Sequence, residues 1–573
     1  MTITQWLIFF LIIQIVHGLG TWKLYVKAGR QAWEAFIPIY NSVILMKIIR
    51  RPWWWTILLF VPIVNLIMFP VVWVETARSF GKNNYIDTFL AIVTLGFYNY
   101  YLNYAAEVSY IENRDLQPKS SSGDWVSSIL FAVVAATIVH TYFIQPFTIP
   151  SSSLEKSLLV GDFLFVSKFH YGARIPMTTV ALPMVHDTIP IAKSKSYLFN
   201  DSYEKRKSSW KNKLQLPYMR FPGFENIKRN EIVVFNQPAD TLLDMNNFTP
   251  DRNYYKPIDK KTNLVKRCVG IPGDSLEIID GYAYINGKKN VLPDRAQLQH
   301  YYTWVSKSNI SQEFIDKYEI ENFWRFYKIE NQLWDNSKVQ GYLNEKDRSF
   351  LKEASRDSLM TEVVGFIQYD DMVKLRMIPI ENKFNINLTA KNASIIEKLP
   401  ITVSLNQFSY QLNDPTVFPH NAEYNWNYDN FGPIYIPKKG ETIKLSMEVL
   451  PLYQRVISEY EGNTLQVKGN QILINGKPAT SYTFKQNYYW MMGDNRHNSI
   501  DARGWGYVPF DHVVGKPVFI WMSWDGIKNP RWERWFTTVH GNGKATSYLI
   551  PFVVLLLGWF GFNKWRKRKK ANG

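Results

Sequence analysis

The stretch Ile149-Pro-Ser-Ser-Ser-Leu-Glu-Lys-Ser-Leu-Leu-Val-Gly-Asp162 directly follows an apolar run of about helix length. A proline before serines ordinarily indicates a turn or a linker. Here, however, the serines stand between a run that is apolar enough to span a bilayer and a second, ordered apolar segment at 158–166. The sequence therefore places three hydroxyl groups immediately outside a predicted membrane helix.

A second stretch, Val265-Lys-Arg-Cys-Val-Gly-Ile-Pro-Gly-Asp274, contains two adjacent cations inside an apolar run. Alternation along a strand would turn Lys266 and Arg267 to opposite faces, one toward the core and the other toward solvent. Burial disfavours the charged amine and lowers its pKa, so that a buried lysine can act as a base near neutral pH. A serine nucleophile needs a base to accept its hydroxyl proton, and a neutral lysine can be that base in place of histidine. The alternative is a lysine that merely snorkels from a strand.

A third stretch, Met491-Met-Gly-Asp-Asn-Arg-His-Asn-Ser-Ile-Asp-Ala-Arg503, is polar and lies between apolar segments. Many of its side chains can hydrogen-bond back to the backbone, which is typical of a constrained loop. Taken alone, the stretch also fits a purely structural hairpin. Its functional interpretation therefore depends on the other two stretches.

The composition favours a folded domain that shares its chain with membrane helices. Of the 573 residues, 46% are hydrophobic, 16% are aromatic and only 20% are charged. The single cysteine, Cys268, excludes an internal disulfide. The histidines are scattered, without a His-Glu-x-x-His motif or a cysteine pair, so neither a metal site nor another cofactor is expected.

Five apolar runs approach the length of about 20 residues that a spanning helix needs: roughly 5–20, 53–74, 86–104, 125–145 and 547–563. Basic residues concentrate between the first two runs and again at 564–570, and such segments stay cytoplasmic. This orientation puts the amino terminus and residues 146–546 outside. If one short run is only interfacial, the amino terminus is inverted but the large domain stays outside.

Residues 146–525 carry the pattern of strands and tight turns, with short runs of Val, Ile, Phe and Tyr bounded by Gly, Asn, Asp and Pro. Strands are expected within 229–238 and 518–522, and helical periodicity only around 311–355. Residues 273–288 and 462–477 echo each other as paired strands that end in Asn-Gly. The echo indicates either two hairpins that look alike or two halves of one unit separated by an insertion.

These patterns predict a mainly β catalytic domain on a multi-spanning α-helical membrane anchor. The expected organisation is an N-terminal membrane domain with about three helices at 1–110, a cytoplasmic linker at 111–124, a transmembrane helix at 125–145, a catalytic domain at 146–294 and 461–546, an insertion of unknown role at 295–460, a transmembrane helix at 547–563 and a basic cytoplasmic tail at 564–573.

In this order after an apolar run, the three stretches resemble the bacterial type I signal peptidases, which are Ser/Lys proteases with a β fold similar to that of LexA. The chain looks like a long version, with extra N-terminal helices and a large insertion. The resemblance implies that Ser153 is the nucleophile and Lys266 the general base. It also implies that the Ser151 hydroxyl and the backbone N–H of Ser153 form the oxyanion hole.

The same resemblance implies supporting roles in the third stretch. Ser499 would orient the Lys266 side chain, and Asp501 and Arg503 would pair to hold the loop. The family's Gly-Asp-Asn-Arg turn corresponds to Gly493, Asp494, Asn495 and Arg496.

Four positions depart from the family pattern: Ser152 and Leu154 flank the nucleophile where Gly or Ser and Met are usual, Ser157 replaces a Thr, and His497 replaces an Asp. Leu for Met keeps the volume and the apolar character of a pocket. The run of three serines leaves Ser152 as the competing nucleophile.

The resemblance implies a substrate with small residues at the first and third positions before the cut. Apolar residues that flank the nucleophile and the base could line shallow pockets that exclude larger side chains: Phe147, Ile149, Leu154, Leu158 and Val265. The substrate would bind extended along a strand edge. The expected partners are signal peptides of preproteins, the lipid bilayer and the secretion machinery, and not nucleic acid. The expected location is a bacterial cytoplasmic membrane, with the catalytic domain on the extracytoplasmic face.

Two other functions fit parts of the pattern. A Ser/Lys protease could cut only itself or one dedicated partner, as LexA-type repressors do. An inactive homologue or β-rich envelope scaffold would require the Ser/Lys pair to be accidental.

Overall fold

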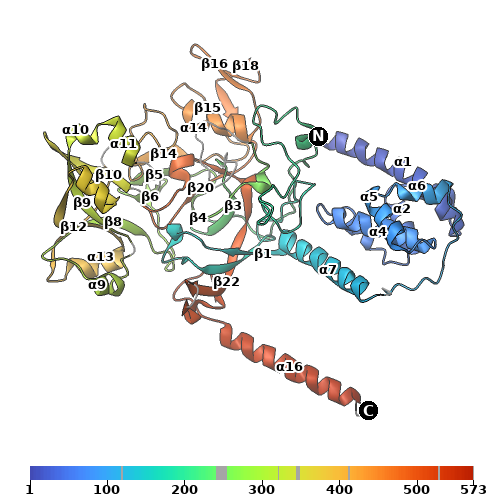
Figure 1. Cartoon of the computed structure of the whole chain (residues 1–573). Helices are drawn as coiled ribbons and strands as arrows, with labels where there is room; N and C mark the ends of the chain where they lie inside the picture. The colour runs from blue at the N-terminus through green and yellow to red at the C-terminus, as the bar shows by residue number, and fades with distance from the viewer. Residues whose placement is uncertain are drawn as a thin grey trace.

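The computed structural model describes residues 1–117, 120–239, 255–320, 322–343, 349–410, 413–526 and 529–571. Figure 1 shows a small helical domain (blue) that is joined to a larger β body by the helices α1 (Ile3–Lys27) and α7 (Ser121–Ile138). The helix α16 (Leu549–Ala571) extends away from the β body. The expectation of a mainly β catalytic domain is confirmed.

The largest sheet has nine antiparallel strands in the order β1-β2-β22-β3-β4-β20-β21, with β23 and β24 also pairing with β22. Its strands are β1 (Ile144–Thr148), β2 (Asp162–Ser167), β3 (Ile232–Asn236), β4 (Asn263–Gly270), β20 (Tyr488–Met492), β21 (Val508–Pro509), β22 (Val513–Asp525), β23 (Asn529–Pro530) and β24 (Thr537–Thr538). Every residue of β3 and of β20 is buried, which explains why both read as continuous apolar runs. The strands expected within 229–238 and 518–522 are present.

Three small sheets surround this one. They are β14 (Phe431–Tyr435) with β5 (Ser275–Ile279), β6 (Tyr282–Ile285) and β7 (Lys288–Lys289); β15 (Thr442–Lys444) with β19 (Ser481–Thr483); and β16 (Leu465–Lys468) with β17 (Gln471–Ile474) and β18 (Lys477–Pro478). The helical turns of the β body are η3 (Ser152–Leu154), α8 (Trp210–Lys213), η4 (Ile258–Lys260), α14 (Leu450–Arg455), η5 (Val456–Tyr460), α15 (Ala502–Trp505), η6 (Phe510–His512) and η7 (Trp532–Arg534).

The internal echo corresponds to two units of the same form, β5-β6-β7 and β16-β17-β18. In each unit an Asn-Gly pair with positive φ makes the second turn: Asn286 and Gly287 in the first, Asn475 and Gly476 in the second. This is the conformation that Asn-Gly hairpin turns adopt. The strand and turn pattern predicted for both segments is thus confirmed.

The predicted insertion 295–460 contains two different parts. Its first part is a six-stranded sheet in the order β10-β11-β9-β12-β8-β13, with short helices against it. Its elements are β8 (Gln299–Ser306), α9 (Gln312–Lys317), β9 (Phe323–Glu330), α10 (Asn331–Trp334), α11 (Ser337–Leu343), β10 (Ser349–Arg356), β11 (Met360–Ile367), α12 (Tyr369–Lys374), β12 (Ile378–Thr389), α13 (Ala390–Glu397) and β13 (Thr402–Gln407). In its second part, Val417, Phe431 and Ile457 share one apolar cluster with Phe235 and Trp490 of the largest sheet.

The N-terminal domain differs from the expected series of spanning helices. Its helices after α1 are η1 (Ala32–Ala35), α2 (Tyr40–Ile48), α3 (Trp55–Leu58), α4 (Asn65–Ser79), α5 (Tyr85–Val93) and α6 (Tyr98–Tyr104). The apolar run 53–74 is divided between α3 and α4, where Ile63 after Pro62 has φ 70°. The run 86–104 is divided between α5 and α6, where Leu95 and Gly96 have positive φ. A helix cannot continue through such residues.

Two helical segments in the described part of the chain are long and apolar enough to cross a membrane: α1, and Ser121–Phe143, which joins α7 to η2 (Val139–Phe143). The multi-spanning anchor is therefore not confirmed. The fifth apolar run does form a helix, α16, and its carboxyl-terminal third carries the basic cluster. Since η2 leads directly into β1, this candidate membrane segment is continuous with the strand that precedes the serines.

Candidate active site

The three serines lie in a turn that leaves the edge strand of the largest sheet. Pairing with β2 continues past β1, since Ile149 N donates to Asp162 O (2.9 Å) and Gly161 N donates to Ile149 O (3.0 Å). The chain then tightens into the single turn η3, which buries Ser153 but leaves Ser151 exposed. The backbone hydrogen bonds between Ile149 and the start of β2 thus fix where the serine turn begins.

Lys266, on β4, reaches the hydroxyl of Ser153. Its Nζ donates a hydrogen bond of 2.5 Å to Ser153 Oγ, and the side chain is only 4% exposed. Burial lowers the pKa of Lys266 to about 8, and the charge of Asp501 opposes this shift only in part. A substantial fraction of the amine is therefore neutral near physiological pH.

The competing serine has a different partner. The Ser152 hydroxyl accepts a hydrogen bond of 2.8 Å from Asn498 Nδ2. Because the two hydroxyls are directed to different partners, the geometry favours Ser153 over Ser152 as the group that a lysine base can deprotonate.

Arg267 is not in solvent, which corrects the simple alternation expected for the two cations. It is 3% exposed and forms a buried, bidentate ion pair with Asp494, with Nε–Oδ1 at 2.7 Å and Nη2–Oδ2 at 2.6 Å. Ser157 Oγ donates to the same carboxylate (2.5 Å). At this point β4 lies between β3 and β20, and Asp494 follows directly after the β20 end, so a carboxylate is available inside.

Asp501 and Arg503 form a second buried ion pair, as the sequence suggested. Arg503 Nε lies 2.9 Å from Asp501 Oδ1, and Nη2 lies 2.8 Å from Oδ2. Burial alone would raise the pKa of Asp501, but the charge and hydrogen bonds of Arg503 outweigh it and hold the pKa below its ordinary value. Asp501 also accepts from Gly493 N (3.0 Å), which fixes both ends of the loop.

Gly493 permits the closest approach between the loop and the serine turn. A Cβ at this position would lie 2.2 Å from Ser499 Oγ and 2.5 Å from Ser153 O. The next contact is the amide of Asn495, whose backbone N donates to Ser153 O (3.1 Å) and whose Nδ2 donates to Ser152 O (3.3 Å). The loop therefore holds the backbone of the serine turn.

Two other members of the predicted loop have different surroundings. Arg496 is buried, and its Nη1 donates to Gly281 O (2.8 Å) rather than to the serine turn. Ser499 Oγ is buried and has no hydrogen-bond partner within the described ranges, so the expected contact that orients Lys266 is not seen.

The five residues expected to line substrate pockets form one apolar cluster. Ile149, Leu154 and Leu158 are buried in it, and Phe147 and Val265 pack against it while partly exposed. Only Phe147 and Val265 are therefore accessible to a substrate, and the other three residues form the buried layer beneath them.

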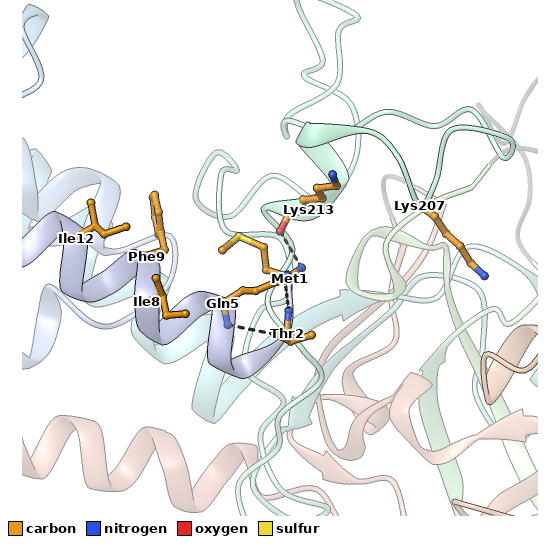
Figure 2. Close-up of a pocket in the computed structure, with 8 residues that line it drawn as sticks. All are labelled: Met1, Thr2, Gln5, Ile8, Phe9, Ile12, Lys207 and Lys213. Atoms are coloured by element: carbon orange, nitrogen blue, oxygen red, sulfur yellow. Dashed lines mark hydrogen bonds between the residues drawn. The ribbon is translucent and has the colours of Figure 1, made fainter.

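Two cavities in the described part of the chain lie elsewhere. A cavity of about 670 Å³ lies between the start of α1 and the two lysines Lys207 and Lys213 (Figure 2). A smaller one of about 140 Å³ is lined by Tyr282 and Arg496 among others. Neither Ser153 nor Lys266 lines either cavity, so the candidate active site lies outside both.

Comparison with known proteins assigns the chain to a family. The model of the family "Signal peptidase, peptidase S26" matches residues 122–373 and 479–524, more than half of the chain. The chain belongs to this family. It is accordingly a membrane-associated serine endopeptidase. Residues 33–113 match a family of unknown function, DUF5684.

Individual relatives are distant in sequence. The chain is similar to a protein named "Signal peptidase I" from Buchnera aphidicola subsp. Baizongia pistaciae, with 21% identity over 390 residues, 68% of this chain and 73% of the relative. A protein of the same name from Buchnera aphidicola subsp. Acyrthosiphon pisum is 22% identical over 463 residues, 78% of this chain and 95% of the relative. Another from Rickettsia felis is 26% identical over 171 residues, 30% of this chain and 45% of the relative.

Sequence reasoning named the residues of the third stretch but missed some of their partners around Ser153 and Lys266. Arg267 was recognised as anomalous, but its partner Asp494 is more than 200 residues away in the chain. Asn498 and the contacts of the insertion also went unpredicted. Two adjacent cations in an apolar run were a usable signal, because each needs a buried partner.

Proposed function

We propose that this chain removes signal peptides from exported preproteins, with Ser153 as the nucleophile and Lys266 as the general base. The observation that carries the proposal is the 2.5 Å hydrogen bond between Lys266 Nζ and Ser153 Oγ at a buried amine whose pKa lies near 8. The names of the relatives support the substrate class.

In the proposed reaction, neutral Lys266 accepts the proton of Ser153 as Oγ attacks the carbonyl carbon before the cut. The ammonium then protonates the leaving amine, and the signal peptide remains as an ester on Ser153. Water attacks this ester while Lys266 again accepts a proton, which releases the new carboxyl end. Lys266 then gives this proton to Ser153 Oγ, so that the serine hydroxyl and the neutral amine are both regenerated.

The oxyanion of each tetrahedral intermediate would accept hydrogen bonds from the Ser153 backbone N–H and the Ser151 hydroxyl. Ser151 is exposed beside the nucleophile, whereas the Ser152 hydroxyl is already held by Asn498. Loss of one such donor typically raises the barrier by about 2.7–4 kcal/mol.

Strand edges near the dyad support an extended substrate. In the described register β1 pairs with β2 alone, and β4 pairs with β20 only from Arg267 onward. The preceding residues of β4, up to Lys266, therefore keep one edge unpaired beside the nucleophile, where an incoming chain could add its backbone. The partly exposed Phe147 and Val265 would meet small substrate side chains.

Placement on the extracytoplasmic face is part of the proposal. If α1 and α7 both span, the amino terminus and the β body share one side, and the helical domain, with the basic residues between the first two apolar runs, lies on the other. Contacts from the start of α1 to the β body support this arrangement, since Trp6 Nε1 donates to Gln215 O (3.3 Å). Ser153 follows the spanning segment by ten residues, which limits its distance from the membrane to about 30 Å.

Cleavage of a purified preprotein by detergent-solubilised protein tests the proposal. Wild type and Ser152→Ala should cut after a small-x-small triplet, as read by mass spectrometry, and Ser153→Ala and Lys266→Ala should not. Cleavage by Ser153→Ala or Lys266→Ala at the wild-type rate would refute the Ser/Lys assignment. A wild type that cuts no preprotein would instead favour a dedicated partner.

A further inference from the structure

The six-stranded sheet of the insertion is bonded to the loop that holds the serine turn. Figure 1 shows this sheet, with β8, β9 and β12, at the left side of the β body. Gln299 N donates to Asp494 O (3.0 Å), Arg496 N donates to Gln299 O (2.9 Å), and Gln299 pairs with Asn495 as a parallel bridge. The first strand of the insertion thus runs beside the loop as a short extra strand.

Side chains strengthen this junction at His497. Its Nδ1 accepts from Tyr301 N (2.9 Å), and its Nε2 lies 2.9 Å from Asp429 Oδ1. The ring stacks on Tyr301 at 5.0 Å with an interplanar angle of 9°. Because Nδ1 accepts, the ring proton is on Nε2 and is directed at Asp429. His497, where the family usually has Asp, is therefore held on two sides by residues of the insertion.

One further contact reaches the nucleophile through a single intermediate. Asn387 Nδ2, on β12, donates 2.7 Å to Asn495 Oδ1, and both side chains are fully buried. The same Asn495 amide donates from Nδ2 to Ser152 O. Because Asn387 Nδ2 is a donor, the side-chain oxygen of Asn495 must face it. The side-chain nitrogen of Asn495 then points toward the serine turn.

The chemistry of Asn387 indicates what this contact does. Its Oδ1 is buried without a hydrogen-bond partner within the described ranges, so the amide is only half satisfied. A half-satisfied buried amide costs stability. Its one described side-chain hydrogen bond is the one that orients Asn495.

We propose that Asn387 is a positioning residue for the cleavage reaction, and that the insertion is in this way part of the active site. The inference rests on the proposed function, because it needs Ser153 as the nucleophile. Asn387 fixes the Asn495 amide, Asn495 holds the carbonyls of Ser152 and Ser153, and these fix Oγ and the oxyanion N–H relative to Lys266. Residues more than 200 positions from the nucleophile thereby set its geometry.

Replacement of Asn387 by two residues separates orientation from packing. Asn387→Asp places an acceptor where a donor stood, so the Asn495 amide must turn and its nitrogen leaves Ser152 O. Asn387→Leu keeps the branched side chain of four heavy atoms, with a larger volume, and removes the donor. Both variants should lower kcat for a preprotein by about 10- to 100-fold, the range that small misplacements of reacting groups produce. KM and the apparent pKa of the pH–rate profile should remain unchanged, because neither the substrate edge nor Lys266 is touched.

Asn385 provides the matched control. It lies two residues earlier on β12, is equally buried and has an Oδ1 without a hydrogen-bond partner in the described part of the chain. Asn385→Asp and Asn385→Leu should shift the unfolding temperature at least as much as the Asn387 variants and leave kcat at the wild-type value. Unfolding temperature and kcat are measured on the same full-length preparations.

Three results would overturn the inference. Wild-type kcat in Asn387→Asp and Asn387→Leu, with Ser153→Ala inactive, would remove Asn387 from positioning and leave the proposed function intact. Equal losses of kcat in the Asn385 and Asn387 pairs would reduce the effect to stability. Cleavage by Ser153→Ala would refute the proposed function itself, and the inference with it.

Discussion

The rate of signal-peptide cleavage should follow the neutral fraction of Lys266. The perturbation is pH alone, varied from 6 to 10. With a pKa of about 8 for the buried amine, the neutral fraction is about 9% at pH 7 and about 91% at pH 9. The single-turnover rate should therefore rise about tenfold between these two values, because only the neutral amine can accept the serine proton. The neutral amine is the active form, so its fraction and the cleavage rate rise with pH. Because burial lowers the pKa of Lys266 below that of a free lysine, this rise occurs near pH 8.

The assay measures single-turnover cleavage of a labelled preprotein with enzyme in excess, so that product release does not mask the chemical step. Lys168 is the group to control for, because burial, with the charges of Arg174 and Arg220, lowers its pKa to about 7. Lys168→Met should keep the inflection near pH 8. A rate that is flat from pH 6 to 10, or an inflection that disappears in Lys168→Met, would refute Lys266 as a base with a lowered pKa.

Two further predictions concern the groups behind the dyad. Arg267→Met should lower the free energy of unfolding by about 3–5 kcal/mol, because it leaves Asp494 buried and unpaired by charge. In the same denaturant titrations Arg356→Met, which breaks an exposed ion pair with Asp335, should cost far less stability, and similar losses in both variants would contradict this account. Gly493→Ala should reduce cleavage strongly, because its Cβ would lie 2.5 Å from Ser153 O, while Gly341→Ala, where a Cβ meets nothing within 4 Å, should leave cleavage unchanged. Wild-type kcat in Gly493→Ala would show that the serine turn does not depend on this close approach.

The β body could be predicted because its signals are local. Strands such as β3 read as apolar runs, and both Asn-Gly turns adopt the positive φ that these residues favour. The pairing of Asp501 with Arg503 was expected from the family resemblance, and the structure shows it.

The membrane domain was harder, because hydropathy averaged over a run does not register single residues that break a helix. Ile63 and Leu95 adopt positive φ inside mostly apolar runs, and each lies in the break between two helices. The preceding Pro62 and the following Gly96 were the available signals. Length and hydropathy alone therefore do not locate the helix breaks inside these runs.

The contacts of the insertion could not be predicted, because no short-range pattern encodes them. Asn387 lies 108 residues from Asn495, and Asp429 lies 68 residues from His497. Each is an ordinary polar residue in its own segment. Only the packing of β8 and β12 beside the loop gives these residues a partner.

The order of strands in the largest sheet has a consequence for the newly made chain. The strands β1 and β2, which flank the serine turn, are separated by β22 from β3 and from β4, which carries Lys266. Until residues 513–525 have been synthesised, the strand pairing of the described sheet does not join these two pairs. At about 5–20 residues per second, Lys266 waits on the order of ten seconds or longer for that strand. The sheet that carries both Ser153 and Lys266 is therefore complete only after its last long strand has been inserted.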